Sequence, residues 1–211
     1  MSDAPEFASY ESTPTSEALI AAARTEFTRS GFAGARVARI AAEAGVNKER
    51  IYGYFGSKER LFEIVMIKAL QEHAQQTPFM EGQTLTDHIM NAYDHHLRDP
   101  ELVRLLMWES LHYSAGEGEE PPFSERRREF YRQKVERLKD VSGVDDDLRA
   151  AVALFVAIGM QAAPFMVPQL GSVILGRPVS DAEVQELLRP MVEQTARAIE
   201  ATLSAGSEAT D

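Results

Sequence analysis

Residues 36–62, RVARIAAEAGVNKERIYGYFGSKERLF, limit what the chain can fold into more than any other segment. Apolar residues recur at helical spacing on both sides of Gly45, which is typical of two short helices that meet at a tight turn. Ala41 is small enough to let the second helix approach the first, and Gly45 can adopt the positive φ that the turn needs. The shared apolar face is expected to consist of Val37, Ile40, Ala44, Val46 and Ile51.

The second of these helices is predicted to present a polar face to solvent. The residues expected to point outward are Asn47, Lys48, Arg50, Tyr52, Gly53 and Tyr54. A second helix laid out in this way is typical of a helix-turn-helix, in which it enters the major groove of DNA as the recognition helix. Lys48 lies nearest the N-terminus of the helix, where such proteins make most base contacts, so we favour it over Arg50 for reading a base.

Together with the preceding stretch SEALIAAARTEFTRSGF, this segment resembles the tetracycline-repressor (TetR) family of regulators. The pattern A-x-x-x-G-V followed by I-Y-x-x-F-x-S-K-E-x-L makes the likeness specific. The resemblance implies an all-helical homodimer with about nine helices per subunit and an effector pocket in the body that controls DNA binding. The residues that carry it are Ala22, Ala23, Phe27, Gly31, Phe32, Val37, Ile40, Ala41, Ala44, Gly45, Val46, Ile51, Tyr52, Phe55, Ser57, Lys58, Glu59 and Leu61.

The resemblance also implies roles for single residues. Lys58 matches the family lysine that meets a phosphate near the start of the fourth helix, and Tyr52 matches a recognition-helix tyrosine that contacts DNA. Arg36 stands where the family usually has a threonine that caps the second helix, and Tyr54 stands where a histidine is common. Arg36 can add a phosphate contact but offers no cap. The alternatives are a solvated Lys58 and tyrosines in the core, a role for which Phe55 is better placed because it shares a face with Ile51.

The charge is distributed unevenly along the chain. The formal net charge is −11, but residues 14–60 carry eight basic and five acidic side chains, so that this segment is basic. The remaining residues are acidic, including a polar stretch at residues 1–13. Only the basic segment suits a phosphate backbone.

The fold class predicted from the helical periodicity is all-α, with an N-terminal three-helix helix-turn-helix head and a C-terminal helical ligand-binding and dimerisation body. We expect a disordered acidic tail at 1–13, the DNA-binding domain at 14–62, the effector-binding and dimerisation domain at 63–203 and a disordered tail at 204–211. Residues 114–122 and 168–178 are predicted loops, the first mobile, and Ser180 and Glu183 form a predicted capping box. Helices are expected at about 14–30, 37–44, 48–54, 58–75, 84–98, 100–113, 123–140, 145–167 and 181–203.

Residues 150–176 contain no charged side chain, a run long enough to raise the alternative of a membrane-spanning helix. Gln161, Pro164, Pro168 and Gln169 interrupt the run, and a helix that is apolar all round can equally be buried in a protein core. Covering it requires several helices or a second subunit. We therefore expect no membrane partner, and a homodimer in which helices 145–167 and 181–203 of two subunits form a four-helix interface.

The five histidines raise the alternative of a helical-bundle metalloenzyme. His88, His95 and His96 lie on one predicted helix, and Glu109 and His112 form an E-x-x-H pair. A di-iron bundle needs two such pairs and two further glutamates, and the sequence supplies one pair. We interpret the histidines as pocket-lining or surface residues and expect no metal and no cofactor. Because nucleophile-elbow, Walker and H-E-x-x-H motifs are also absent from the sequence, we expect no enzyme.

The function predicted from these features is that of a cytoplasmic repressor that a small-molecule effector releases from a palindromic double-stranded DNA operator. The absence of cysteine and of a secretory signal pattern favours the cytoplasm. An alternative is a dimeric DNA-binding protein without an effector. Large apolar or amphipathic body residues are the candidates for the effector site: Met66, Leu70, Tyr93, Met107, Trp108, His112, Phe130, Phe155, Met160, Gln161, Phe165 and Met166.

Overall fold

The computed structural model describes residues 10–80, 82–112 and 124–205, and these residues form ten helices and no strand. The predicted all-α fold class is therefore confirmed. The chain divides into two compact units. Unit 1 comprises Met1–His73 and Arg104–Arg127, and unit 2 comprises Ala74–Val103 and Arg128–Asp211. The predicted boundary at residue 62 stays a prediction, as do the tails.

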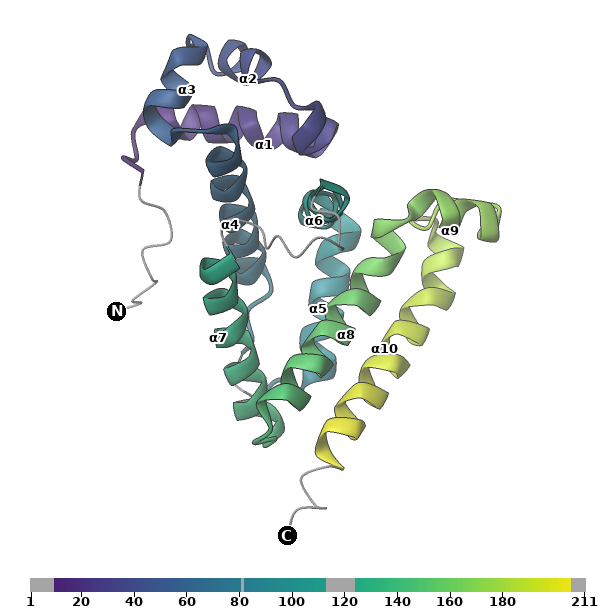
Figure 1. Ribbon diagram of the computed structural model, residues 1–211. Coiled ribbons are helices and arrows are strands. Elements are labelled where there is room, and N and C mark those ends of the chain that lie inside the picture. Colours follow the sequence, from purple (N-terminus) through teal and green to yellow (C-terminus); the bar gives the residue numbers. More distant parts are fainter. Residues whose placement is uncertain (1–9, 81, 113–123, 206–211) are drawn as a thin grey trace. The chain divides into compact units, whose positions relative to one another are not determined.

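Unit 1 is built on α1 (Pro14–Gly34), α2 (Val37–Glu43), α3 (Lys48–Phe55) and most of α4 (Lys58–Gln76), with most of α6 (Glu101–His112). In Figure 1, α2 and α3 lie across the same side of α1. Leu19 and Phe27 of α1, Ile40 of α2 and Ile51 of α3 are all fully buried. Their burial holds α2 and α3 on the longer α1, because neither of these two short helices is long enough to be stable alone in water.

The predicted end of α1 at Ser30 is confirmed in part, because Gly31 interrupts the helical conformation but further helical residues follow it. Helical structure continues to Gly34, with a kink at Gly31, whose φ is 67° and ψ is 176°. The indole of Trp108 on α6 fills the space beside Gly31, where a Cβ would lie 2.6 Å from the ring, and its Nε1–H donates to the Thr28 carbonyl over 3.3 Å. Gly31 is thus required both by its backbone conformation and by the indole packed against it.

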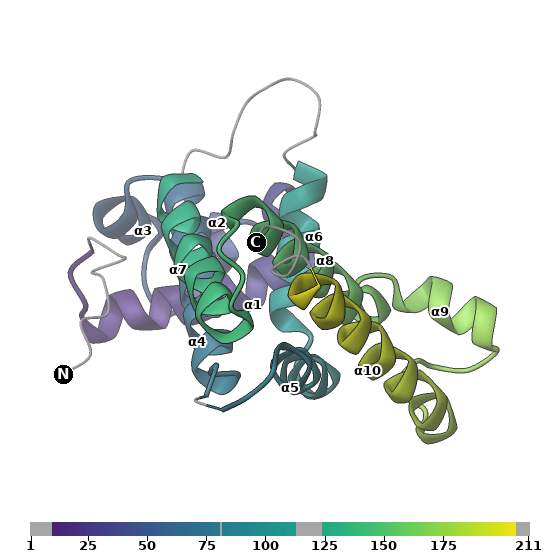
Figure 2. The ribbon, with the colours of Figure 1, turned by 90° about the horizontal axis from the view of Figure 1, so that it is seen from below.

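Unit 2 contains α5 (Leu85–Arg98), α8 (Asp147–Met166) and α10 (Ala182–Ser204), with most of α7 (Ser124–Ser142). In Figure 2, α10 is seen along its length with α5 beside it, and both helices pack against α8. Small residues of α8, including Ala150, Ala153 and Ala157, allow this close approach. The larger core side chains come from neighbouring helices, namely Leu85 and Ile89 of α5, Leu138 of α7 and Leu203 of α10.

Two predictions about residues 168–183 were wrong. The predicted loop at 168–178 contains a further helix, α9 (Pro168–Leu175). Pro168 occupies the first turn, where no N–H is needed, and Gly176 ends the helix with a φ of 68°, so both are start and stop signals rather than loop residues. The cap of α10 is Asp181 and not Ser180, because the Asp181 carboxylate accepts the Glu183 N–H over 3.0 Å. The Glu183 carboxylate pairs instead with Arg177. The predicted loop at 114–122 lies outside the described residues.

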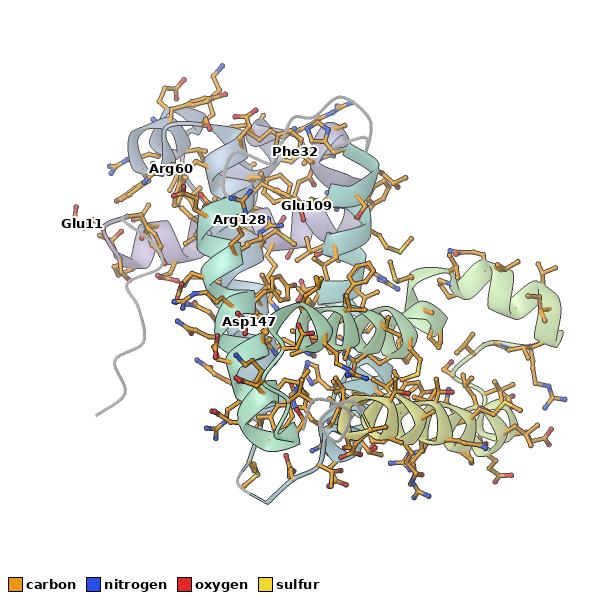
Figure 3. The ribbon with its side chains drawn as sticks, turned by 60° about the horizontal axis from the view of Figure 1, so that its bottom comes forward. Glu11, Phe32, Arg60, Glu109, Arg128 and Asp147 are labelled. Atoms are coloured by element: carbon orange, nitrogen blue, oxygen red, sulfur yellow. The ribbon has the colours of Figure 1, made fainter. Side chains whose placement is uncertain are left out.

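Unit 2 leaves several apolar side chains of α8 and α10 exposed. We call this set the α8–α10 face, and it consists of Leu148, Val152, Phe155, Val156, Leu187 and Met191, all exposed in the single chain. A groove between the two helices is lined by Val152, Val156, Ile199 and Thr202. Figure 3 shows side chains of α9 standing clear of the other helices of unit 2, and α9 has no buried residue. In the part of the chain that the structure describes, α8 alone is long and apolar enough to cross a membrane, a property that it shares with the core helices of soluble proteins.

Candidate nucleic-acid interface

The turn between α2 and α3 has the geometry that the sequence predicts. Gly45 adopts a φ of 70°, and the Val46 N–H donates to the Ala41 carbonyl over 2.9 Å to close the turn. No other atom lies within 4 Å of the position where a Gly45 Cβ would stand, so it is the backbone conformation that requires glycine. Asn47 then caps α3, because its side-chain oxygen accepts the Arg50 N–H over 3.2 Å.

Helix α3 is anchored on one side and open on the other. Ile51 and Phe55 are buried, with 0% and 1% of their surfaces exposed. The opposite side presents exposed side chains of Lys48 and Arg50, and Tyr52 is 51% exposed. Asn47 and Gly53 are also exposed, as is the acidic Glu49. A rigid helix with cationic and hydrogen-bonding side chains on its free face can contact both phosphates and base edges.

A buried carboxylate of α1 holds the start of α2, where no side-chain cap is present. Arg36 is the N-cap residue and makes no side-chain cap, but its N–H donates to Glu26 Oε1 over 2.8 Å. The same oxygen accepts from Arg39 Nε over 2.9 Å, and Arg29 pairs with the other oxygen. Burial alone would raise the pKa of Glu26, but the hydrogen bonds from Arg39, Arg36 and Arg29 outweigh it and lower the pKa. Glu26 therefore stays charged and fixes α2 on α1.

Lys58, the candidate phosphate contact, is only partly exposed at the start of α4. Its Nζ lies 4.6 Å from the centre of the Phe32 ring, a cation–π contact within unit 1. Burial lowers the pKa of Lys58, and the nearby carboxylates of Glu59 and Glu26 oppose this shift. As predicted, Ser57 caps this helix, because its hydroxyl accepts the Arg60 N–H over 3.1 Å.

Tyr54 is partly buried and connects α3 to the start of α1. The Thr13 hydroxyl donates to the Tyr54 hydroxyl oxygen over 3.3 Å, and this contact lowers the pKa of Tyr54. Tyr10 packs on Phe55 with ring centres 5.8 Å apart, and its hydroxyl donates to Glu17 over 2.7 Å. Residues 10–13, which belong to the predicted acidic tail, thus lie beside α3. Glu11 lines a shallow hollow with Arg50 and Tyr54.

Comparison with known proteins identifies the family. Residues 19–65 match the model of bacterial regulatory proteins of the tetR family, and residues 84–197 match that of the tetracyclin repressor-like C-terminal domain. The HTH-type transcriptional repressor SCO4008 of Streptomyces coelicolor is 35% identical over 188 residues, which cover 88% of this chain and 94% of that protein. The chain belongs to the tetR family. It is a DNA-binding regulator, and the resemblance found in the sequence is confirmed.

Other tetR-family proteins match more distantly. The HTH-type transcriptional repressor NicS of Pseudomonas putida is 35% identical over 104 residues, 46% of this chain and 49% of that one. The crystal structure of the putative transcriptional regulator SCO4942 from Streptomyces coelicolor has a TM-score of 0.64 and 26% identity, and covers 86% of this chain and 97% of that chain. These relatives are transcriptional regulators.

The candidate effector residues fall into both units of this tetR-family chain. Met66, Leu70, Met107, Trp108 and His112 belong to unit 1, where Met66 and Leu70 are buried in α4. In unit 2, Tyr93 lies 5.6 Å from Phe165 between ring centres, and Met160 packs on the same cluster. Phe155 is 76% exposed and lies on the α8–α10 face rather than in the interior. Phe130 and Met166 are partly buried, and Gln161 is buried.

The residues of the alternative metal site have other contacts. Glu109 is paired with Arg127, and the ring of His112 packs on Phe32 with ring centres 4.4 Å apart. Figure 3 labels Glu109 and Phe32, which both belong to unit 1. Within the described ranges, no group of three histidine, aspartate or glutamate residues is placed to hold a metal ion. The expected absence of a metal stays a prediction.

Glu26, which positions α2 on α1, was not among the predicted site residues. The signal was present, because Glu26 lies seven residues after Leu19 and so falls on the apolar face of α1. A carboxylate on such a face needs partners when buried, and arginines at 29, 36 and 39 were available nearby in the sequence.

Proposed function

We propose that this protein is a homodimeric repressor that binds a palindromic operator and that a small-molecule effector releases it. The observation that carries the proposal is the open face of α3, where Lys48, Arg50 and Tyr52 are exposed on a helix anchored by buried Ile51 and Phe55. In a dimer the two α3 helices would enter successive major grooves, roughly 34–36 Å apart. The family works in the bacterial cytoplasm, where we place this protein, without enzymatic activity.

We expect some side chains to contact bases and others to contact phosphates. Lys48 and Arg50 reach base edges, while Lys58, Arg36 and Tyr52 contact the phosphate backbone. Asn47, Gly53 and Tyr54 complete the contact surface of α3, with Asn47 keeping its cap. Base contacts supply sequence preference, and phosphate contacts supply affinity that falls with salt.

The α8–α10 face supports the dimer. Six exposed apolar side chains on two adjacent helices form a larger apolar surface than a monomeric soluble protein usually leaves in water. Packing the same two helices of a second copy on this face would bury it in a four-helix interface.

Selection of bound duplexes from a random DNA pool tests the proposal. We expect the full-length protein to enrich a palindrome with half-sites about one helical turn apart, or a multiple of it. A selection that enriches no sequence, or only single half-sites, contradicts the dimeric repressor. A DNA-binding dimer without an effector remains distinguishable, because no small molecule would then release it from the selected duplex.

A further inference from the structure

Lys134 on α7 carries a charge that the described part of the protein does not neutralise. Its ammonium is partly buried in unit 2, 5.4 Å from the centre of the Phe130 ring, with no carboxylate or hydrogen-bond acceptor from any described residue. Burial lowers the pKa of Lys134, and no acid opposes the shift. Its neighbours on the same helix differ, since Arg132 pairs with Glu129 and Lys139 pairs with Asp147. A partly buried ammonium without a counter-charge loses part of its hydration with nothing to replace it, so its presence needs a reason.

His88 on α5 offers a second polar atom without a partner near Lys134. The side chain is 8% exposed and stacks on Phe79, with ring centres 4.1 Å apart. The ring hydrogen-bonds the backbone of Pro78, while the buried Nδ1 has no hydrogen-bond partner among the described residues. Burial, and then the charge of Lys134, lower the pKa of His88 to about 4. At neutral pH the imidazole is therefore uncharged, and its Nδ1 is a free acceptor.

The contacts of this pair include two aromatic rings. Lys134 lies over Phe130 and His88 stacks on Phe79, which itself packs on the apolar core of unit 2. A ligand held here would meet one ammonium donor and one imidazole acceptor at one end and hydrocarbon over the rest of its surface. Mostly apolar walls with a few placed polar groups are typical of small-molecule sites.

We propose that Lys134 and His88 form the polar end of the effector site, and that the effector is an apolar carboxylic acid bound as its anion. The carboxylate accepts from the Lys134 ammonium, and a hydroxyl or N–H beside it donates to His88 Nδ1. A cationic effector would be repelled by Lys134, and a neutral one would leave the ammonium without a counter-charge. The inference rests on the proposed function only in treating this ligand as the effector.

The direct test is calorimetric titration of the full-length protein with linear and aromatic carboxylates of four to sixteen carbons. Each carboxylate is compared with its methyl ester and with the amine of the same skeleton. We expect carboxylates to bind and the esters and amines to bind at least tenfold more weakly. Because a hydrogen bond to a charged group is lost, Lys134→Met should weaken carboxylate binding about 10–100-fold. The control Arg132→Met removes the same charge from the exposed side of α7 and should leave binding unchanged.

Stability of the ligand-free protein gives a readout that does not depend on the choice of ligand. Lys134→Met removes a partly buried charge that no described carboxylate neutralises, so its melting temperature should rise above that of the wild type, while Arg132→Met should not raise it. A fall in melting temperature for Lys134→Met would show that the ammonium has a structural partner and would overturn the proposal. Equal carboxylate binding by Lys134→Met, preferential binding of the amines, or no binding by any carboxylate would also overturn it.

Separate measurements distinguish an error in the anionic effector from an error in the proposed repressor function. Binding of ligand-free wild-type protein to the selected operator tests the repressor and does not involve Lys134. If the operator is bound and no carboxylate binds, only the anionic effector is wrong. If no duplex is bound, the calorimetric result still decides whether Lys134 and His88 hold an anion.

Discussion

The amide N–H of Arg36 donates to Glu26 Oε1 over 2.8 Å, a contact between the first residue before α2 and a carboxylate buried in α1. Arg39 reaches the same oxygen from the next turn of α2. The orientation of α2, and through the turn at Gly45 that of α3, therefore depends on one charged group inside the unit. This relationship connects the stability of unit 1 with the placement of the proposed DNA contacts.

Replacing Glu26 should loosen this arrangement. Glu26→Gln keeps an acceptor for the Arg36 N–H but loses the charge shared with Arg29 and Arg39, so we expect a loss of about 1–3 kcal/mol in the free energy of unfolding. Urea unfolding followed by circular dichroism measures it. The matched control is Glu72→Gln, which removes the more exposed ion pair with Arg24 and should cost at most about 1 kcal/mol. Equal losses for the two variants would show that Glu26 has no special role.

Two glycines of unit 1 should respond in opposite ways to alanine. Gly31→Ala should destabilise the protein by more than about 1–2 kcal/mol, because the residue has a positive φ and its Cβ would lie 2.6 Å from Trp108. Gly53→Ala lies in a helix with open space around it and should stabilise the fold by about 0.5–1 kcal/mol. If Gly53 faces DNA as proposed, Gly53→Ala should nevertheless weaken operator binding. A stabilised Gly53→Ala protein that binds DNA as well as wild type does would remove Gly53 from the interface.

Acid should weaken the fold of unit 2. Burial lowers the pKa of both His88 and His96 to about 4, so the folded state binds fewer protons than the unfolded state between that pH and 6.5. Stability present at neutral pH is therefore lost as the pH falls through this window, by about 2 kcal/mol per histidine between pH 7 and pH 5. Urea unfolding at both pH values should show a smaller difference for His88→Gln than for wild type. The exposed His112 provides the control, and an equal reduction in His112→Gln would refute the assignment.

The α8–α10 face should hold two copies together. Phe155→Asp places a charge at the centre of an exposed apolar surface, where it would be buried without a partner in the dimer. We expect light scattering at micromolar concentration to give a dimer for wild type and a monomer for this variant. Met80→Asp alters an apolar side chain that is 58% exposed outside the face and should remain dimeric. A wild-type monomer would contradict the proposed interface.

The sequence predicted the parts of the fold that local signals determine. Gly45 and the cap at Ser57 were read correctly because each signal lies within a few residues of the structure it specifies. Helix α9 differs from the predicted loop because Pro168 and Gly176, which are common in loops, here start and end a helix. The packing of the Trp108 indole beside Gly31 could not be predicted, because Trp108 lies far along the chain on another helix.

The DNA-binding site could be predicted from the sequence and the anion site could not, because only the first depends on local signals. Six of the eight proposed DNA contacts lie on α3 or at its N-cap, so periodicity alone identifies this free face, while Arg36 and Lys58 lie at the starts of other helices. Lys134 and His88 come from separate helices, and neither residue carries a local motif. Their proximity, and the absence of a neutralising carboxylate beside Lys134, can be seen only in the folded unit.

Lys58 should contribute to affinity without contributing to sequence preference. Lys58→Ala removes one proposed phosphate contact per head, so binding to all duplexes should weaken about equally, and the salt dependence should fall by about one ion per head. The ammonium also packs on Phe32, so Lys58→Arg, which keeps the charge, serves as the control for lost packing. Titrations at several salt concentrations measure both effects. Unchanged affinity and salt slope in Lys58→Ala would show that the ammonium stays on Phe32 and does not meet DNA.

The measurement that tests the central claim most directly is the affinity of wild type and Lys48→Ala for the selected operator and for single-base variants of it. If α3 reads DNA, wild type should discriminate against a change at the contacted base by about 1–3 kcal/mol, and Lys48→Ala should lose that discrimination at this one position. Arg50→Ala, tested in parallel, should affect a different position or none. If Lys48→Ala and Arg50→Ala both retain the wild-type preference at every position, α3 is not the helix that reads the operator.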